Sequence, residues 1–331
     1  MKKILSAIPG DSSFLKPSLL TFRQLGWEIR NVDYRKTDFL AAIKNNLRLA
    51  RRAASELITQ NRPSIKRVIN NNEIIRVAKL WHPDLFLTFK GEIILPETIL
   101  SLKQLSVKTV NWYPDHLLNT PQNSKFIAAY DCFIYWDKWR ISIYHKQGLK
   151  NVFYLPFCTI PEKTFPSSDK KYQINFIANW HAHREKKVAP VRDMGLMIWG
   201  NQKWEKTALG QNYQWGPTTV PQMIKIIRAT KISLNVHVVE QIYSEGTNVR
   251  PFEVTGAGGF LLSNVRKSLY ELFKVGREIE VFDSDEELVE KTKFYLKNDR
   301  LREKIARAGW ERTKRDHTYL KRFTLLLKYL N

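Results

Sequence analysis

Short apolar runs alternate along the chain with segments whose apolar residues recur every three or four positions. The runs are typical of buried strands, and a spacing of three and four is typical of helices. Predicted strands lie in residues 2–8, 27–34, 82–91, 107–116, 130–137, 151–157, 173–180, 195–200, 231–237 and 277–284. This alternation predicts an α/β fold in which helices cover both faces of a parallel sheet.

The segment TIPEKTFPSSDKKY, residues 159–172, interrupts the alternation and is rich in Pro, Ser and Lys. Such a composition is typical of a linker, and strands and helices resume after it. Because a domain usually contains roughly 100–200 residues, two successive α/β domains of about 160 residues each are predicted.

Composition adds a strong positive charge to this picture. Lys and Arg number 54 against 32 Asp and Glu, so the formal net charge is +22. A field of this size favours anionic partners, namely nucleic acid, phosphorylated substrates or an acidic membrane face. The hydrophobic fraction of 43% is ample for packed cores and excludes wholesale disorder.

Cysteine usage and the N-terminus indicate a cellular compartment. Cys132 and Cys158 form no CxxC and no cluster at metal spacing, so neither a disulfide framework nor a structural zinc is expected. The apolar start at 4–8 ends at Pro9 and is shorter than the core of about 7–15 residues in a secretory signal. No run approaches the ~18 apolar residues of a membrane span. A cytoplasmic location is predicted.

The stretch SEGTNVRPFEVTGAGGFLLS, residues 244–263, places Glu245 and Glu253 just before a glycine-rich turn. Pro251 and the Gly-Gly pair delimit a predicted short helix over 251–257. Glu253 then lies in the first helical turn, where the helix dipole and free N–H groups favour an anion. A carboxylate there can accept both hydroxyls of a ribose. The alternative is that Glu253 only caps the helix and Glu245 is a solvated loop residue.

Several segments, taken in order, resemble one known family. They are WHPDLFLTFKG, VNWYPDH and GLKNVFYLPF in the first half, and KISLNVH, GTNVRPFEVTGAGGFLLSN and the run that starts at LFKVGREIEVF in the second. Their order and spacing resemble the CgeB-like, spore-maturation-type branch of the group 1 glycosyltransferases. The resemblance covers most of the chain and is strongest from about residue 172 to 325.

The resemblance implies the GT-B architecture, in which two Rossmann-like domains face each other across a cleft. It places an acceptor domain at 1–165, a nucleotide-sugar donor domain at 166–310, and a last helix at 311–331 that crosses back onto the N-terminal domain. It implies a hexosyltransferase-like enzyme that moves a sugar from a UDP- or GDP-sugar to an acceptor. No cofactor beyond this donor is expected.

The resemblance also implies roles for single residues. Glu245 and Glu253 form a Glu-x7-Glu pair like that of the retaining group 1 enzymes, in which the first glutamate meets the donor sugar and the second the ribose. Asn248 and Arg250 lie between them and are expected to bind the nucleotide sugar. For Arg250, pairing with the diphosphate and pairing with Glu253 inside the fold both stay open. In FIANWHAHREKK, Arg184 stands where the family has a phosphate-binding base, and its planar fork suits phosphate oxygens.

Two places in the first half are further candidates. Gly10 follows the first strand and opens a helix, so its backbone is expected to admit a donor phosphate or sugar. Asp115 and His116 follow the end of a strand, where open α/β sheets build their sites. Asp115 is expected to act as a general base on an acceptor hydroxyl, or either residue to bind a sugar hydroxyl. A plain glycine turn and an ordinary polar loop are the alternatives.

The Asp-Ser-Asp at 283–285 invites a metal interpretation, which a simpler one replaces. Ser284 and Glu287 make a capping box for the helix that follows, and this explains the residues without a metal. No metal ligand is therefore assigned, and metal-independent transfer is expected.

A concentration of basic residues suggests where an acceptor comes from. On a predicted helix at 40–58, an apolar stripe is flanked by Lys44, Arg48, Arg51 and Arg52. Such a helix can lie on an anionic membrane, track nucleic-acid phosphates, or form a solvated face. The first case predicts a lipid-linked or anionic acceptor and a peripheral position at the inner membrane face.

Two other functions stay open on the sequence. One is a sugar-nucleotide enzyme like a 2-epimerase on the same fold. The other is a nucleic-acid-binding protein, or a transferase that acts on modified nucleic-acid bases. The ten tryptophans form no stacking-platform motif, which argues against a dedicated nucleic-acid module.

Overall fold

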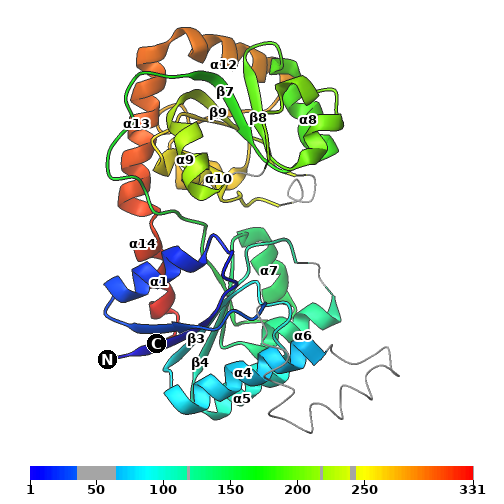
Figure 1. Ribbon diagram of the computed structural model, residues 1–331, viewed down its shortest axis with the longest axis vertical. Coiled ribbons are helices and arrows are strands. Elements are labelled where there is room, and N and C mark those ends of the chain that lie inside the picture. The colour runs from blue at the N-terminus through cyan, green and yellow to red at the C-terminus, as the bar shows by residue number, and fades with distance from the viewer. Residues whose placement is uncertain (36–64, 118–119, 217–218, 239–243, 331) are drawn as a thin grey trace. The chain divides into compact units, whose positions relative to one another are not determined.

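The computed structural model describes residues 1–35, 65–117, 120–216, 219–238 and 244–330. The chain forms two compact units (Figure 1). Unit 1 contains Met1–Tyr135, Ile141–Leu155 and Phe323–Asn331, and unit 2 contains Trp136–Arg140 and Pro156–Arg322. Within the described ranges, no helix is both long and apolar enough to span a bilayer.

Unit 1 is built on a parallel sheet with the strand order β2-β1-β3-β4-β5-β6. Its strands are β1 (Lys3–Ala7), β2 (Glu28–Asn31), β3 (Leu85–Phe89), β4 (Lys108–Trp112), β5 (Cys132–Tyr135) and β6 (Val152–Tyr154). Its helices are α1 (Leu15–Gln24), α4 (Ile65–Trp81), α5 (Pro96–Gln104), α6 (Pro121–Ala129) and α7 (Lys138–Lys146), the start of α7 being counted with unit 2. The strand order reverses between β1 and β3.

Unit 2 is built on a second parallel sheet with the order β11-β10-β9-β7-β8. Its strands are β7 (Tyr172–Ile177), β8 (Leu196–Trp199), β9 (Thr230–Asn235), β10 (Leu261–Asn264) and β11 (Glu280–Phe282). Its α-helices are α8 (Ala182–Val188), α9 (Val220–Arg228), α10 (Arg250–Gly256), α11 (Lys267–Leu272), α12 (Asp285–Lys297) and α13 (Asp299–Asp316). Short 3-10 helices cover Ala189–Val191, Gln202–Lys206 and Gly210–Asn212. Here the strand order reverses between β7 and β9.

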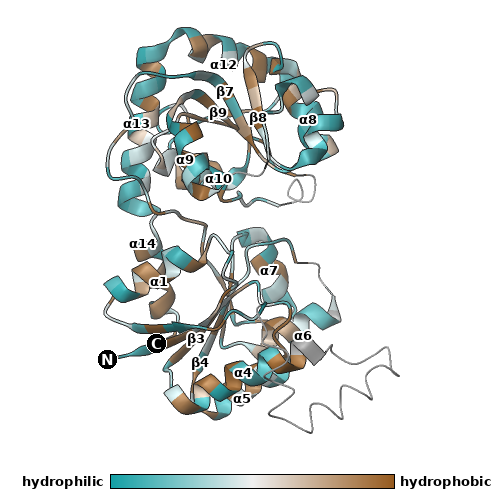
Figure 2. Ribbon diagram, in the orientation of Figure 1, coloured by the Kyte–Doolittle hydropathy of each residue, from teal (hydrophilic) through white to brown (hydrophobic). Residues whose placement is uncertain are grey.

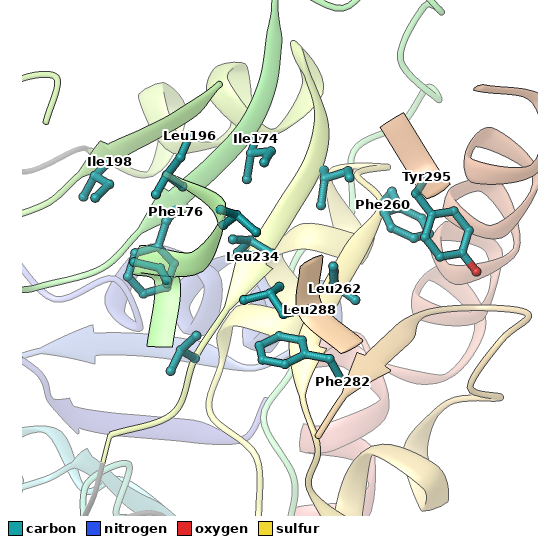
Figure 3. Packing of buried hydrophobic residues seen from close by; sticks show 14 of the residues in the cluster. Ile174, Phe176, Leu196, Ile198, Leu234, Phe260, Leu262, Phe282, Leu288 and Tyr295 are labelled. Atoms are coloured by element: carbon teal, nitrogen blue, oxygen red, sulfur yellow. The ribbon is translucent and has the colours of Figure 1, made fainter. Parts of the chain in front are cut away.

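Burial explains why the strand segments read as continuous apolar runs. All five residues of β3 are buried, because helices cover both faces of a parallel sheet. Figure 2 shows hydrophobic residues along the strands, and both hydrophobic and hydrophilic residues on helices such as α5. In unit 2, Figure 3 shows Phe176, Leu234 and Leu288 within one buried cluster, to which strands and α12 both contribute.

The last helix, α14 (Tyr319–Lys328), carries the chain from unit 2 back into unit 1. Phe323 is fully buried, stacks on Phe22 with ring centroids 4.3 Å apart, and meets the edge of Trp112 at 5.9 Å. Immediately before it, the guanidinium of Arg322 donates to the carbonyl oxygens of Pro156 and Phe157. The predicted return of the C-terminal helix is therefore present.

The predicted α/β class with two Rossmann-like sheets is confirmed. The change of unit at Pro156 comes before the boundary predicted at residue 165, because the start of 159–172 pairs with the last helices: Thr159 N donates to His317 O over 3.1 Å. Of the predicted 311–331 segment, residues 323–331 belong to unit 1. The predicted basic helix at 40–58 lies outside the described residues.

Candidate functional site

The carboxyl ends of β7 and β9, where the strand order of unit 2 reverses, are joined by Arg184. The side chain lies in α8, and its Nε donates to Val236 O over 3.0 Å, just beyond β9. Its Nη1 donates to Asn179 O over 3.1 Å, just beyond β7. In open α/β sheets ligands bind at such a reversal. Arg184 thus lies at this reversal of the strand order.

Glu253 and Arg250 form an ion pair in the first turn of α10. Arg250 Nη1 lies 2.7 Å from Glu253 Oε2, and the two side chains are 19% and 17% exposed. Arg250 also donates to Ile177 O, the last residue of β7, over 2.9 Å, and contacts the sulfur of Met223 in α9. Of the two roles open for Arg250, pairing with Glu253 is the one present in this structure.

The predicted short helix exists, but its first amides have partners inside the protein. Phe252 N and Glu253 N donate to Val249 O, and Arg250 N donates to the side-chain oxygen of Asn248. Pro251 has no N–H. A donor substrate could therefore form hydrogen bonds with the side chains of this turn, but not with its backbone amides.

Asn248 belongs to a buried polar network that the sequence did not reveal. Its side-chain nitrogen donates to Asn235 Oδ1 over 3.1 Å. Next to it, His237 is fully buried, with Nδ1 2.7 Å from Asn264 Oδ1 and Nε2 3.0 Å from Thr247 Oγ1. Burial lowers the pKa of His237 to about 3, so the ring is neutral and accepts a hydrogen bond at Nε2. The network fixes the 244–249 segment to the ends of β9 and β10.

Glu245 is separate from the Arg250–Glu253 pair. Its carboxylate lies 2.9 Å from Lys267 Nζ, with side chains 39% and 65% exposed. The neighbouring Gly246 packs against the ring of Trp136, where an added Cβ would lie 2.5 Å from a ring carbon. Ser244 hydrogen-bonds to Asp137, a buried carboxyl whose pKa burial raises. Residues 136–137 thus contact the loop of Glu245 on both sides of this residue, through Ser244 and Gly246.

A basic cluster at this end of the sheet also escaped sequence analysis. The Arg266 side chain follows β10, and among the described residues its Nε and one Nη have no hydrogen-bond partner although both are buried. Burial lowers the pKa of Arg266. Burial, aided by charges that include Lys187, Arg266 and Arg184, also lowers the pKa of His183. Positive charge therefore gathers on the β7, β9 and β10 ends, as an anionic ligand requires.

An aromatic cavity of about 660 Å³ lies in unit 2 between the end of β8 and α9. Trp199, Tyr213 and Trp215 line it together with Gln222 of α9, and Trp215 is 87% exposed. Trp199 pairs in the sheet with Ile177, whose carbonyl accepts from Arg250. The sequence signal for this cavity was the repeated Trp-Gly in IWGNQ and YQWGP.

Unit 1 has a cavity of about 240 Å³ where its own strand order reverses. Asp115 lines it, with Oδ2 2.6 Å from Lys90 Nζ, whereas the half-buried His116 is not among the residues that line it. Gly10 lies beside the cavity, but its N–H donates to Asp33 Oδ2 over 2.8 Å. The backbone N–H of Gly10, which was expected to bind a donor phosphate or sugar, is thus hydrogen-bonded to the carboxylate of Asp33.

The Asp-Ser-Asp segment has the capping role predicted for it. Ser284 Oγ accepts from Glu287 N over 3.1 Å, and Glu287 Oε2 accepts from Asp283 N over 2.8 Å. Asp285 pairs with Lys187 at 2.8 Å. Across the ranges that the structure describes, no three His, Cys, Asp or Glu side chains cluster as a metal site would require.

Comparisons with known proteins agree with this geometry. Residues 181–328 match the family model described as glycosyl transferase-like. No curated protein matches the chain by sequence.

Three solved structures similar to the chain span nearly its whole length. Sucrose-phosphate synthase from Thermosynechococcus elongatus has a TM-score of 0.68 and 12% identity, with 99% of this chain and 98% of that one covered. A glycosyltransferase from Rickettsia africae has 0.65 and 11%, with 99% and 97% covered. Anabaena HepE, in complex with UDP and glucose, has 0.63 and 10%, with 100% and 99% covered. At such identities the likeness is one of fold. The chain therefore has the GT-B fold, and its residues 181–328 are similar to glycosyl transferases.

Proposed function

We propose that the protein is a glycosyltransferase that takes its sugar from a nucleoside-diphosphate sugar, UDP- or GDP-linked, and transfers it without a metal ion. The carrying observation is the aromatic cavity of unit 2. Its Trp199 pairs in the sheet with Ile177, whose carbonyl oxygen accepts from Arg250 of the half-buried Arg250–Glu253 pair. HepE, which shares the fold, was crystallised with UDP and glucose. That likeness supports the donor class.

The cavity has the size and the lining for a base and ribose. Its volume of about 660 Å³ falls within the roughly 300–1,000 Å³ usual for small-molecule sites. Aromatic side chains stack on any nucleobase, and Trp215 presents an exposed ring there. Glu253 supplies the carboxylate for the ribose hydroxyls. It is linked to the cavity by contacts, because it pairs with Arg250, which donates to Ile177 O, and Ile177 pairs in the sheet with Trp199.

The diphosphate is assigned to the basic side chains at the ends of β7, β9 and β10. Arg184 stands there with part of its guanidinium exposed, and Arg266 holds buried N–H groups without a partner in the described part of the chain. Arginine forks bind phosphate oxygens in pairs and stabilise the charge that develops as a diphosphate leaves. Glu245, exposed on its loop, faces the sugar in this proposal.

The narrower assignments remain part of the proposal. The CgeB-like branch rests on the quoted sequence segments, and the cytoplasmic location rests on cysteine usage and the N-terminal residues. The membrane contact of residues 40–58, and with it a lipid-linked acceptor, rests on sequence alone. Asp115 is the candidate base on the acceptor, held in unit 1 by Lys90.

Calorimetric titration of UDP and GDP tests the donor site. Replacing Glu253 by Gln removes the charge but keeps the size, and should weaken nucleotide binding by about tenfold, or 1.4 kcal/mol, since hydrogen bonds to charged groups contribute about that much. The matched control is Glu287→Gln, because Glu287 also lies in the first turn of a helix and pairs with a base, Lys291, at 2.8 Å. Equal affinities in the wild type and Glu253→Gln would remove the ribose role.

Product analysis tests the reaction. The enzyme is incubated with UDP-N-acetylglucosamine and other donors, with and without EDTA. Slow donor hydrolysis that EDTA leaves unchanged is expected. An epimerised sugar would favour the 2-epimerase alternative, and activity abolished by EDTA and restored by Mn²⁺ would contradict metal-free transfer.

A further inference from the structure

The cavity of unit 1 differs in size from the donor cavity of unit 2. Its volume is about 240 Å³, below the roughly 300–1,000 Å³ of sites that hold a drug-sized ligand. It is formed by the loops that follow β1, β2, β3 and β4, where the sheet order reverses and ligands of open α/β sheets bind. The space suits one ring-sized group and is too small for a nucleotide sugar.

The charges that line this cavity cancel. The lining contains two acids and two bases, and they are paired with each other: Lys90 with Asp115 at 2.6 Å, and Arg35 with Asp11 at 3.2 Å. Glu92 lies 3.6 Å from Lys90 and adds negative charge behind the first pair. In a chain with a net charge of +22 this is a place without positive excess. An anion would have to separate a base from its carboxylate, which a neutral hydroxylated ligand need not do.

The floor of the cavity is aromatic. Phe14 lines it and is the outer member of a stack: its ring lies 4.6 Å from that of Phe89, which in turn lies 5.3 Å from Trp112. Phe89 and Trp112 are buried, whereas Phe14 is only half-buried. Tyr34 supports the stack, because its hydroxyl donates to Phe89 O over 3.3 Å. A flat apolar surface beside paired charges matches the face and the hydroxyl edge of a pyranose ring.

The backbone at Lys90 shows that the polar side of the cavity is held in place. Lys90 has φ 65°, a left-handed conformation that favours glycine, and Gly91 follows with φ 64°. Lys90 N donates to Trp112 O, and Asn111 Nδ2 donates to Lys90 O. Strained residues persist where their surroundings over-determine them, and they gather at functional sites. From this backbone conformation the amine of Lys90 lies 2.6 Å from Asp115 Oδ2.

We propose that this cavity binds one neutral sugar ring, with Phe14 against the face of the ring and the Lys90–Asp115 pair hydrogen-bonded to its hydroxyls. Identifying that ring as the reacting end of the acceptor rests on the proposed transfer activity. The class of acceptor is then a neutral glycoside, whatever the group that carries it.

Ligand-observed NMR on the full-length protein tests the proposal with a panel of methyl glycosides and hexose 6-phosphates. We expect at least one methyl glycoside to bind with a Kd of about 1–10 mM, and Lys90→Gln, Asp115→Asn and Phe14→Ala each to weaken it about tenfold. Lys103→Gln is the matched control, because Lys103 forms a half-exposed pair with Asp131, 3.0 Å apart, and does not line the cavity. It should leave the Kd unchanged within about twofold.

Three results would overturn the proposal: no glycoside bound at about 50 mM, equal affinity in the cavity variants and Lys103→Gln, or hexose phosphate bound about tenfold more tightly than the neutral glycoside. UDP and GDP titrations on the same samples separate the two claims. Nucleotide binding without glycoside binding removes the sugar site and leaves the proposed function. Glycoside binding that depends on Lys90, without nucleotide binding, does the reverse.

Discussion

Gly246 and Trp136 lie so close that a Cβ added to the glycine would be 2.5 Å from Cε3 of the indole. The contact fixes the position, relative to the indole ring, of the loop that carries Glu245 and leads to Asn248. Real Cβ atoms do not approach a ring so closely, so either the loop or the indole must move if the glycine is replaced.

Gly246→Ala should therefore destabilise unit 2 by about 1–3 kcal/mol, the usual cost of overpacking, and weaken nucleotide binding as the loop shifts. Urea denaturation and calorimetry measure the two effects. Trp136→Leu should restore part of both in the double variant, because a smaller side chain leaves room for the methyl group. A double variant no better than Gly246→Ala would show that the indole contact is not the cause.

Acid should destabilise unit 2 through two buried histidines. Burial lowers the pKa of His237 to about 3 and of His317 to about 4, from 6.5. Below pH 6.5 the unfolded chain binds protons that the folded chain does not, so stability is full above that pH and falls as pH decreases towards 4. The expected slope is about 1.4 kcal/mol per pH unit for each histidine.

Urea denaturation at pH 7.5, 6.0 and 5.0 measures this slope. His237→Gln should lose stability at pH 7.5 through its broken network but show a shallower slope between pH 6 and 5. A slope equal to that of the wild type would mean that folding does not lower the pKa of His237.

The C-terminal helix should stabilise unit 1 through Phe323. Phe323→Ala removes a fully buried ring from Phe22 and Trp112 and should cost about 3–5 kcal/mol. Leu325→Ala, on the same helix but 38% exposed, is the control and should change stability by less than about 0.5–1 kcal/mol. If denaturation experiments show that both changes lower the free energy of unfolding equally, the contacts of the Phe323 ring do not stabilise unit 1 in particular.

Both cysteines should be unreactive in the folded protein. Cys132 and Cys158 are buried, and burial raises the pKa of each thiol to about 12, so almost no thiolate exists at pH 8. A chromogenic disulfide reagent should modify neither in native protein and both in guanidinium chloride. Rapid labelling of the native protein would show that unit 1 or unit 2 opens readily.

Sequence periodicity predicted the strands and helices well, because buried parallel strands are apolar throughout. Gly26 and Gly148, with φ of 80° and 86°, follow the ends of α1 and α7, as glycines commonly do at helix ends. What the sequence could not give is pairing at a distance. Arg250 lies three positions from Glu253, so the sequence alone suggested that they could pair. Its hydrogen bond to Ile177 O joins residues that are 73 positions apart, and no local pattern indicates it.

The candidate residues that the sequence missed are those whose meaning depends on the sheet order. Lys90 gains importance only because β3 lies next to β4, which brings it to Asp115. His237 and Arg266 look like an ordinary strand-end histidine and surface arginine until β9 and β10 are paired. The basic segment 40–58 lies outside the described residues, so its membrane role stays a prediction.

The return of the chain to unit 1 bears on how the protein is made. A ribosome releases the sheet of unit 1 long before residues 323–331, so the nascent chain carries Phe22 and Trp112 without their cover throughout the synthesis of unit 2. Domains generally fold in the order in which they are made, but unit 1 can be completed only after unit 2 has been synthesised. A premature stop before Phe323 would leave an exposed apolar surface on the domain that is made first, the kind of surface that chaperones and proteases recognise.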